Sequence, residues 1–262
     1  MNNNSEIRRA LLFEGWTSMY DLVTSKPTSA PRRQLPDKTG SAGFQQDGGT
    51  TAFGLSVAGK TLSYDIVTYL DSQFSERQHR LNLSARQMEN AKTELFSQKL
   101  IKEIWLGKSL FLVPTPALYT VMGFESPYDK RNISDIHSFL VVLAEKLIEP
   151  NPLVKYTRRE VPLDNSNSIS MVDLIVYLKS GERLAYEIVH RSITNVAALA
   201  ARLEGKGFAQ VIFLATDFNV KERVWASIRS AGFDPDFLST IRCTIFSAII
   251  RQKKELMLKG RV

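Results

Sequence analysis

The stretch "MVDLIVYLKSGERLAYEIVHRS", residues 171–192, predicts two β-strands joined by a tight turn. Ser180, Gly181 and Glu182 separate two apolar runs, the pattern of a β-hairpin. Each predicted strand carries one carboxylate, Asp173 on the first and Glu187 on the second. Because successive strand side chains point to opposite faces, the two acids meet near one end of the hairpin if both face the same side.

The segments around this hairpin predict an α/β (α+β) fold with a mixed sheet. Residues 133–149 predict a helix, because apolar residues recur there at intervals of three and four. These are Ile133, Ile136, Leu140, Leu143 and Leu147. Further strands are expected at 156–163, 208–216 and 240–247, with helices at 193–207 and 220–232.

This order of elements, with these acids, resembles the restriction-endonuclease-like, PD-(D/E)XK fold over about residues 134–246. The resemblance implies that Asp173 and Glu187 are catalytic residues and metal ligands, with Mg²⁺ as the cofactor of an active nuclease. The same resemblance expects a lysine two residues after the second acid, where this sequence has Val189. The sheet is therefore either an active nuclease, a degenerate relative that binds without cutting, or a domain whose acids have only structural roles.

The missing lysine leaves other groups to consider near the acids. A lysine of this kind stabilises charge that develops during phosphodiester cleavage. Candidates to replace it are Arg191, Arg202 and Lys206. Glu145 could supply a third acid, and His137 could act as a base; a solvated helix end and a packing residue are the structural alternatives.

Residues 61–123 predict three helices followed by a two-stranded ribbon, which is the order of a winged helix. Ser63 and Ser84 are expected to cap the first and third helices, and Gly107 and Lys108 to form the turn of the ribbon. In that architecture the third helix enters the major groove of DNA. The polar side chains expected to contact DNA are Arg86, Gln87, Asn90, Lys92, Thr93, Lys99 and Lys108. A solvated helix face is the alternative, because Glu89 and Glu94 interrupt the basic residues.

Together the two modules resemble the C-terminal extension of HerA/FtsK-type DNA-translocating ATPases, in which a winged helix precedes a nuclease-like domain. This resemblance implies double-stranded DNA as a partner, a translocating ATPase or other subunits as further partners, and a role in plasmid, mobile-element or defence DNA transactions. Residues 54–61, "GLSVAGKT", match the bare P-loop pattern, but the polar residues before them do not form the buried strand that a P-loop requires.

Composition sets the remaining expectations. The formal net charge of +7 favours an anionic partner such as nucleic acid. One cysteine, Cys243, excludes an intrachain disulfide, and its apolar neighbours predict a buried strand residue. Without an apolar signal segment or membrane span, a cytoplasmic protein with no membrane partner is expected. The predicted segments outside the two modules are a helical segment at 1–25, a flexible linker at 26–60 and an exposed basic tail at 251–262, with the nuclease-like domain at 130–250.

Three functions follow from these patterns, and a homo-oligomer is compatible with each. The first is a DNA-binding protein whose nuclease-like domain does not cut. The second is a Mg²⁺-dependent endonuclease that uses Asp173 and Glu187. The third is a protein-interaction subunit of a DNA-translocase complex, assembled through residues 61–123.

Overall fold

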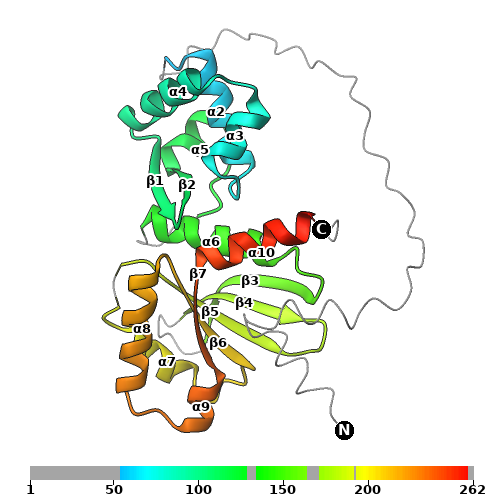
Figure 1. Ribbon diagram of the computed structural model, residues 1–262, viewed down its shortest axis with the longest axis vertical. Coiled ribbons are helices and arrows are strands. Elements are labelled where there is room, and N and C mark those ends of the chain that lie inside the picture. Colours follow the sequence, from blue (N-terminus) through cyan, green and yellow to red (C-terminus); the bar gives the residue numbers. More distant parts are fainter. Residues whose placement is uncertain (1–53, 129–133, 164–170, 192, 259–262) are drawn as a thin grey trace, which may run out of the picture. The chain divides into compact units, whose positions relative to one another are not determined.

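The computed structural model describes residues 54–128, 134–163, 171–191 and 193–258 (Figure 1). The helical segment predicted at 1–25, and the predicted linker as far as residue 53, lie outside these ranges. Within them the chain combines helices with a two-stranded and a five-stranded sheet, so the α/β prediction is confirmed.

The first part of the described chain consists of helices followed by an antiparallel ribbon, in the predicted order. Leu106 pairs with Ser109, so Gly107 and Lys108 form the turn of the ribbon as predicted. The elements are α2 (Val57–Thr68), α3 (Phe74–Leu81), α4 (Ala85–Ser97), β1 (Ile101–Leu106), β2 (Ser109–Pro114) and a short helix that was not predicted, α5 (Pro116–Met122).

Helix α2 begins earlier than the sequence analysis expected. Its N-cap is Ser56, whose hydroxyl accepts a hydrogen bond from the Gly59 N–H at 3.0 Å. Ser63, the predicted cap, lies inside the helix and donates its hydroxyl to the Gly59 carbonyl at 2.8 Å. The predicted boundary between linker and helix at residues 60 and 61 is therefore wrong. Ser63 was expected to be the cap, but a serine can also lie inside a helix, where its hydroxyl donates to a backbone carbonyl one turn earlier.

Helix α4 begins at the predicted cap. The Ser84 hydroxyl accepts from the Gln87 N–H at 3.3 Å, and the Gln87 side-chain oxygen accepts from the Ser84 N–H at 2.9 Å. This reciprocal pair is a capping box. Met88, Ala91 and Leu95 form the buried face of the helix, as their spacing predicts.

The second part of the chain is a five-stranded mixed sheet in the order β3-β4-β5-β6-β7. The first three strands are antiparallel neighbours, whereas β5, β6 and β7 are parallel. The strands are β3 (Val154–Pro162), β4 (Met171–Leu178), β5 (Arg183–Val189), β6 (Gln210–Ala215) and β7 (Ile241–Ile245). The helices are α6 (Asp135–Ile148), α7 (Val196–Leu203), α8 (Phe218–Ser230), α9 (Pro235–Thr240) and α10 (Phe246–Leu258).

A hydrophobic core joins α7 and α8 to the face of the sheet that carries Ala185, Val189 and Phe213. Helix α6 contacts β3, β4 and β5, and α10 packs beside α6 (Figure 1). The apolar run of β6 is buried throughout, which fits a central parallel strand covered by helices.

The basic segment expected as an exposed tail at 251–262 is helical as far as residue 258, and Arg251 and Lys254 in it are exposed. Residues 246–258 form α10, in which Phe246 and Ile249 are buried. Lys253 forms an ion pair with Asp71, and the Lys254 ammonium lies 3.2 Å from the Glu76 carboxylate. The helix was not predicted, because the apolar residues that anchor it precede the basic segment; residues 259–262 lie outside the described ranges.

Cys243 lies in β7 as predicted, but it is half-buried rather than buried. Burial raises the pKa of its thiol to about 12, so the thiol stays protonated at neutral pH. In the part of the chain that the structure describes, none of the helices combines the length and apolar character that a membrane crossing requires.

Candidate functional site

The two acids of the hairpin lie opposite each other on adjacent strands. Leu174 pairs with Tyr186 in the antiparallel register of β4 and β5, so the next residues, Asp173 and Glu187, are level with each other and point to the same face. The regular pairing ends at this step. The opening hairpin therefore brings its two carboxylates together, as its alternation predicted.

Both carboxylate oxygens of Asp173 are hydrogen-bonded. Oδ2 accepts a hydrogen bond from the backbone N–H of Ile188 at 2.7 Å, at the point where the strands stop pairing. Oδ1 lies 3.1 Å from Nε2 of His137, which reaches it from the first turn of α6. Asp173 thus connects α6, β4 and β5.

Glu187 is buried at 4% exposure, between Ala185 and Val189 along the strand and level with Phe213 of β6. One of its oxygens, Oε1, is buried without a hydrogen-bond partner among the described residues. Burial, together with the charge and hydrogen bond of Asp173, raises the pKa of Glu187 well above its usual value, while the nearby Arg202 guanidinium acts in the opposite direction. Glu187 is therefore held as a neutral acid beside Asp173.

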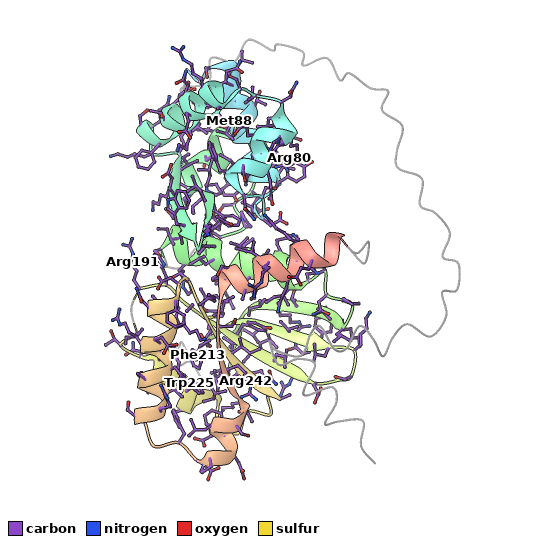
Figure 2. The ribbon with its side chains drawn as sticks, in the orientation of Figure 1. Arg80, Met88, Arg191, Phe213, Trp225 and Arg242 are labelled. Atoms are coloured by element: carbon purple, nitrogen blue, oxygen red, sulfur yellow. The ribbon has the colours of Figure 1, made fainter. Side chains whose placement is uncertain are left out.

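Val189, at the position where the resemblance expects a lysine, lies in the hydrophobic core with Val196 and Ala200 of α7. Among the three proposed replacements, Arg202 is close enough to affect Glu187. Arg191 follows β5 and is exposed (Figure 2). The carbonyl oxygen of Lys206 accepts a hydrogen bond from Arg183 at 2.9 Å, which places its backbone at the opposite end of β5 from the acids.

Two histidines lie near the acid pair. Burial opposes protonation of His137, but the hydrogen bond and charge of Asp173, with a further contribution from Glu160, raise its pKa. Burial, with the charges of Arg191 and His137, lowers the pKa of His190. Both ring nitrogens of His190 are buried and have no hydrogen-bond partner among the described residues. His137 is therefore held as a cation more readily than His190.

The third acid beside the pair is Glu160 rather than the expected Glu145. Glu145 accepts hydrogen bonds from the Thr157 hydroxyl at 2.8 Å and from Nε of Arg159 at 3.1 Å, so it holds α6 to β3. Glu160 lies between two residues that pair with Leu174 and Val172, which makes it level with Asp173. Its φ of 52° interrupts the regular strand, a feature that alternation in the sequence does not reveal.

The donor set at this site only partly suits a metal ion. Asp173 and Glu187 are carboxylates of the kind that Mg²⁺ prefers. However, no group of three or more histidines, cysteines or acids within the described ranges is placed to hold a metal ion. Since Asp173 already accepts two hydrogen bonds, a cation would compete with His137 and Ile188 for its oxygens.

The polar face of α4 is the second candidate site. Arg86, Asn90 and Thr93 are exposed on it. Gln87 is exposed but its oxygen serves the capping box. Lys92 is half-buried: its ammonium lies 2.9 Å from Glu89 and 3.2 Å from Glu103, and 5.1 Å from the Phe74 ring centre. The two carboxylates offset much of the charge that Lys92 was expected to offer DNA.

The remaining two predicted DNA contacts lie outside α4. Lys99 follows the helix with a φ of 58°, in the left-handed conformation that lets the chain turn into β1. Lys108 is exposed in the turn of the ribbon. The salt bridge between Lys92 and Glu103 holds β1 beside α4, and we call α4 and the ribbon the helix-and-ribbon surface. The turn that carries Lys108 is at the far end of the ribbon, where a Cβ atom at Gly107 would lie 2.9 Å from Ser247 of α10.

The segment that matches the P-loop pattern has a structural explanation. Gly59, Lys60 and Thr61 lie in the first turns of α2, not in a loop before a helix. A Cβ atom at Gly59 would lie 2.4 Å from Oε2 of Glu94, whose carboxylate accepts hydrogen bonds from Ser56. The glycine therefore permits α2 and α4 to approach closely.

A scan against protein-family models found no match to this chain, and a search of curated proteins found no similar sequence. The family resemblances drawn from the sequence accordingly enter the proposal below as support from element order and motif positions.

Proposed function

We propose that this protein binds DNA through α4 and its ribbon, and that its sheet is a nuclease-like domain that does not cut. The observation that carries the second part is the acid pair itself. Asp173 has both oxygens hydrogen-bonded within the protein, Glu187 is buried with a raised pKa, and the lysine position is a core valine. Each of these features favours a role for the acid pair in stabilising the fold over a role in cleaving DNA.

The missing cation has a large expected effect on any cleavage reaction. Removing one preorganised charge-stabilising donor typically slows a reaction by about 10²–10³-fold. Val189 cannot supply such a charge, and the apolar residues of α7 around it leave no polar route for a substitute at that position. A non-cutting domain is the function that this arrangement favours.

DNA binding is supported by charge and by exposed side chains. The chain carries a net charge of +7, and Arg86 and Asn90 are exposed on α4 with side chains suited to base edges or phosphates. Lys108 is also exposed, but at the ribbon turn, which lies at the far end of the ribbon from α4. The order of three helices and a ribbon also fits the winged-helix architecture, in which these positions face DNA.

A Mg²⁺-dependent endonuclease is the second candidate, favoured by one specific observation. Asp173 and Glu187 are level with each other where β4 and β5 separate, and the Arg202 guanidinium lies near enough to oppose the rise in the pKa of Glu187. In an active enzyme these carboxylates would hold the metal, which would activate water and polarise the phosphodiester. Arg202 would then take the position of the missing lysine.

One experiment separates the two candidates. Purified protein is incubated with supercoiled plasmid in Mg²⁺ or Mn²⁺, and binding and cutting are scored in the same samples by native and denaturing gels. We expect a salt-sensitive shift without nicking. Nicking that Asp173→Asn and Glu187→Gln both abolish, with the shift retained, would assign the endonuclease function instead.

A protein-interaction role for the helix-and-ribbon surface is favoured by two exposed aromatic side chains. Phe96 at the end of α4 is 56% exposed, and Trp105 of β1 is 61% exposed. Large exposed apolar side chains are common at protein interfaces. A stable complex that forms without DNA and is lost in Trp105→Ala would support this function, whereas loss of DNA binding alone in that variant would not.

A further inference from the structure

An aromatic and cationic cluster lies on the outer strands of the five-stranded sheet. The rings of Tyr156 and Tyr177 are stacked, with centres 4.3 Å apart and planes inclined by 18°. The Arg158 guanidinium lies 5.7 Å from the first ring centre and 5.9 Å from the second. We call these three residues the tyrosine ledge. Tyr156 is 40% exposed, although it is one of the largest side chains on β3.

The tyrosine ledge lies on the face of β3 that points away from α6. Thr157 and Arg159 of β3 both contact Glu145 on α6. Because strand side chains alternate, Tyr156 and Arg158 point to the other face. Tyr156 pairs with Tyr177, and Arg158 pairs with Ile175, so the ledge extends across β3 and β4.

The acid pair lies on the same face as the ledge. On β4, Asp173, Ile175 and Tyr177 alternate along one side, and Asp173 is level with Glu187 of β5. Four residues of strand between Tyr177 and Asp173 span about 14 Å. Ile175, which lies between them on this side of β4, is buried in the core that α7 and α8 form with the sheet. The accessible part of the ledge is therefore its outer edge, where Tyr156 and Arg158 of β3 are exposed.

The chemistry of the ledge suits unpaired nucleobases. Aromatic rings and an arginine plane give stacking surfaces that accept any base, and the arginine also attracts phosphate. Bases within a duplex are already stacked and paired, so they cannot reach a surface of this kind. Among the strands that the structure describes, β3 is also at the edge of the sheet, so one side of it has no neighbouring strand there.

We propose that the tyrosine ledge is a stacking site for single-stranded DNA, whose bases stack on the exposed ring of Tyr156 at the outer edge of the sheet. This inference rests on the proposed function as a DNA-binding protein. It goes further by specifying that the sheet binds single-stranded DNA. Duplex DNA binds the α4 surface, and an unpaired strand binds the sheet.

The test uses the full chain and an oligothymidine that carries one 2-aminopurine. Binding is followed by fluorescence anisotropy, and base stacking by quenching of 2-aminopurine. Tyr156→Ala is expected to weaken oligothymidine binding by about 5- to 150-fold, the range for loss of one stacked base, and to remove the quenching. Tyr156→Phe, which keeps the ring, is the matched control and should retain both signals. Arg158→Gln should weaken binding and reduce its salt dependence.

The outcomes distinguish this inference from the function on which it rests. Retained duplex binding, with oligothymidine binding that Tyr156→Ala leaves unchanged, would overturn the ledge alone. Absence of binding to both forms of DNA would overturn the proposed function as well. A dimer that Tyr156→Ala dissociates, with oligothymidine affinity unchanged, would assign the ledge to self-association through the edge strand. Circular dichroism and a thermal melt of each variant exclude unfolding as the cause of lost binding.

Discussion

The carboxylate of Asp173 accepts the backbone N–H of Ile188 across 2.7 Å, at the step where β4 and β5 cease to pair. A side chain of one strand thus satisfies a backbone donor of the next, in place of a ladder hydrogen bond. Ile188 remains paired with Leu214 of β6 on its other side. Asp173 therefore stabilises the sheet where its strands separate.

Replacing Asp173 by alanine should destabilise the fold. The change leaves the Ile188 N–H and the His137 ring without their acceptor, and unsatisfied buried groups cost about 1–3 kcal/mol each. Asp173→Asn keeps an oxygen acceptor and should cost less. Urea unfolding at pH 7 measures both changes, with Glu222→Ala on the exposed face of α8 as the control. Equal stability of Asp173→Ala and the control would remove the structural role assigned to this acid.

Glu187→Gln should stabilise the protein at neutral pH. The pKa of Glu187 is raised in the folded state, so its contribution to stability is fully present below the unfolded pKa of about 4.3 and is lost as pH rises toward the folded value. Glutamine has no proton to lose and avoids this penalty. The variant's advantage over the parent protein should therefore grow as the pH rises from 5 to 8.

Urea unfolding of both proteins at pH 5, 6.5 and 8 measures this difference. Glu182→Gln in the hairpin turn changes the same charge near the surface and should show no comparable trend. A Glu187→Gln protein that is less stable than the parent at pH 8 would mean that Glu187 is ionised in the fold.

Asp65 should be among the most sensitive residues of the helical part. It forms an ion pair with the fully buried Arg77, and its Oδ2 accepts from Nε of Arg80 at 2.7 Å. The Arg77 guanidinium also donates to the Asp65 carbonyl at 2.8 Å and to the Tyr69 carbonyl at 2.6 Å. Removing one partner of a buried ion pair typically costs about 3–5 kcal/mol, because the other charge stays buried.

Asp65→Ala should therefore lower the free energy of unfolding by about that amount, measured by urea unfolding of the full chain. Glu89→Ala removes an acid from the exposed face of α4 and should change stability by less than about 0.5 kcal/mol. A similar small change for Asp65→Ala would show that the Arg77 charge finds other partners.

Arg86 and Lys92 should affect duplex binding differently, although the sequence groups them together. Arg86 is exposed, so Arg86→Ala should weaken binding and reduce the slope of log K against log salt by about one unit if it contacts phosphate. Lys92 is held by Glu89 and Glu103, so Lys92→Ala should leave that slope nearly unchanged. Anisotropy titrations with a duplex at three salt concentrations measure both. Equal effects of the two variants would show that Lys92 leaves its carboxylates when DNA binds.

The fold was largely predictable where one local pattern decided the outcome. The capping box at Ser84 and Gln87, the turn at Gly107 and Lys108, and the alternation that brings Asp173 level with Glu187 depend on residues close in sequence. The start of α2 was missed because Ser56 and Ser63 are equally good caps by composition. The hydrogen bonds of Ser56 to the Glu94 carboxylate separate them, and these join residues far apart in the chain.

The candidate site was predictable in its acids but not in their surroundings. Sequence spacing pairs Asp173 with Glu187, yet it could not show that His137 supplies a hydrogen bond from α6 or that Glu145 is used by Thr157 and Arg159. These contacts depend on how α6 packs against the sheet. The irregular φ of Glu160 likewise follows from the whole sheet rather than from its neighbours in sequence.

The ion pair of Lys253 with Asp71 spans 182 residues. During synthesis, the helical segments emerge before α10 does. The ion pairs of Asp71 and Glu76 with α10 can form only once that helix has been made. A truncation that removes α10 would therefore change the helical part near the start of the described chain, because Asp71 and Glu76 would lose their cationic partners.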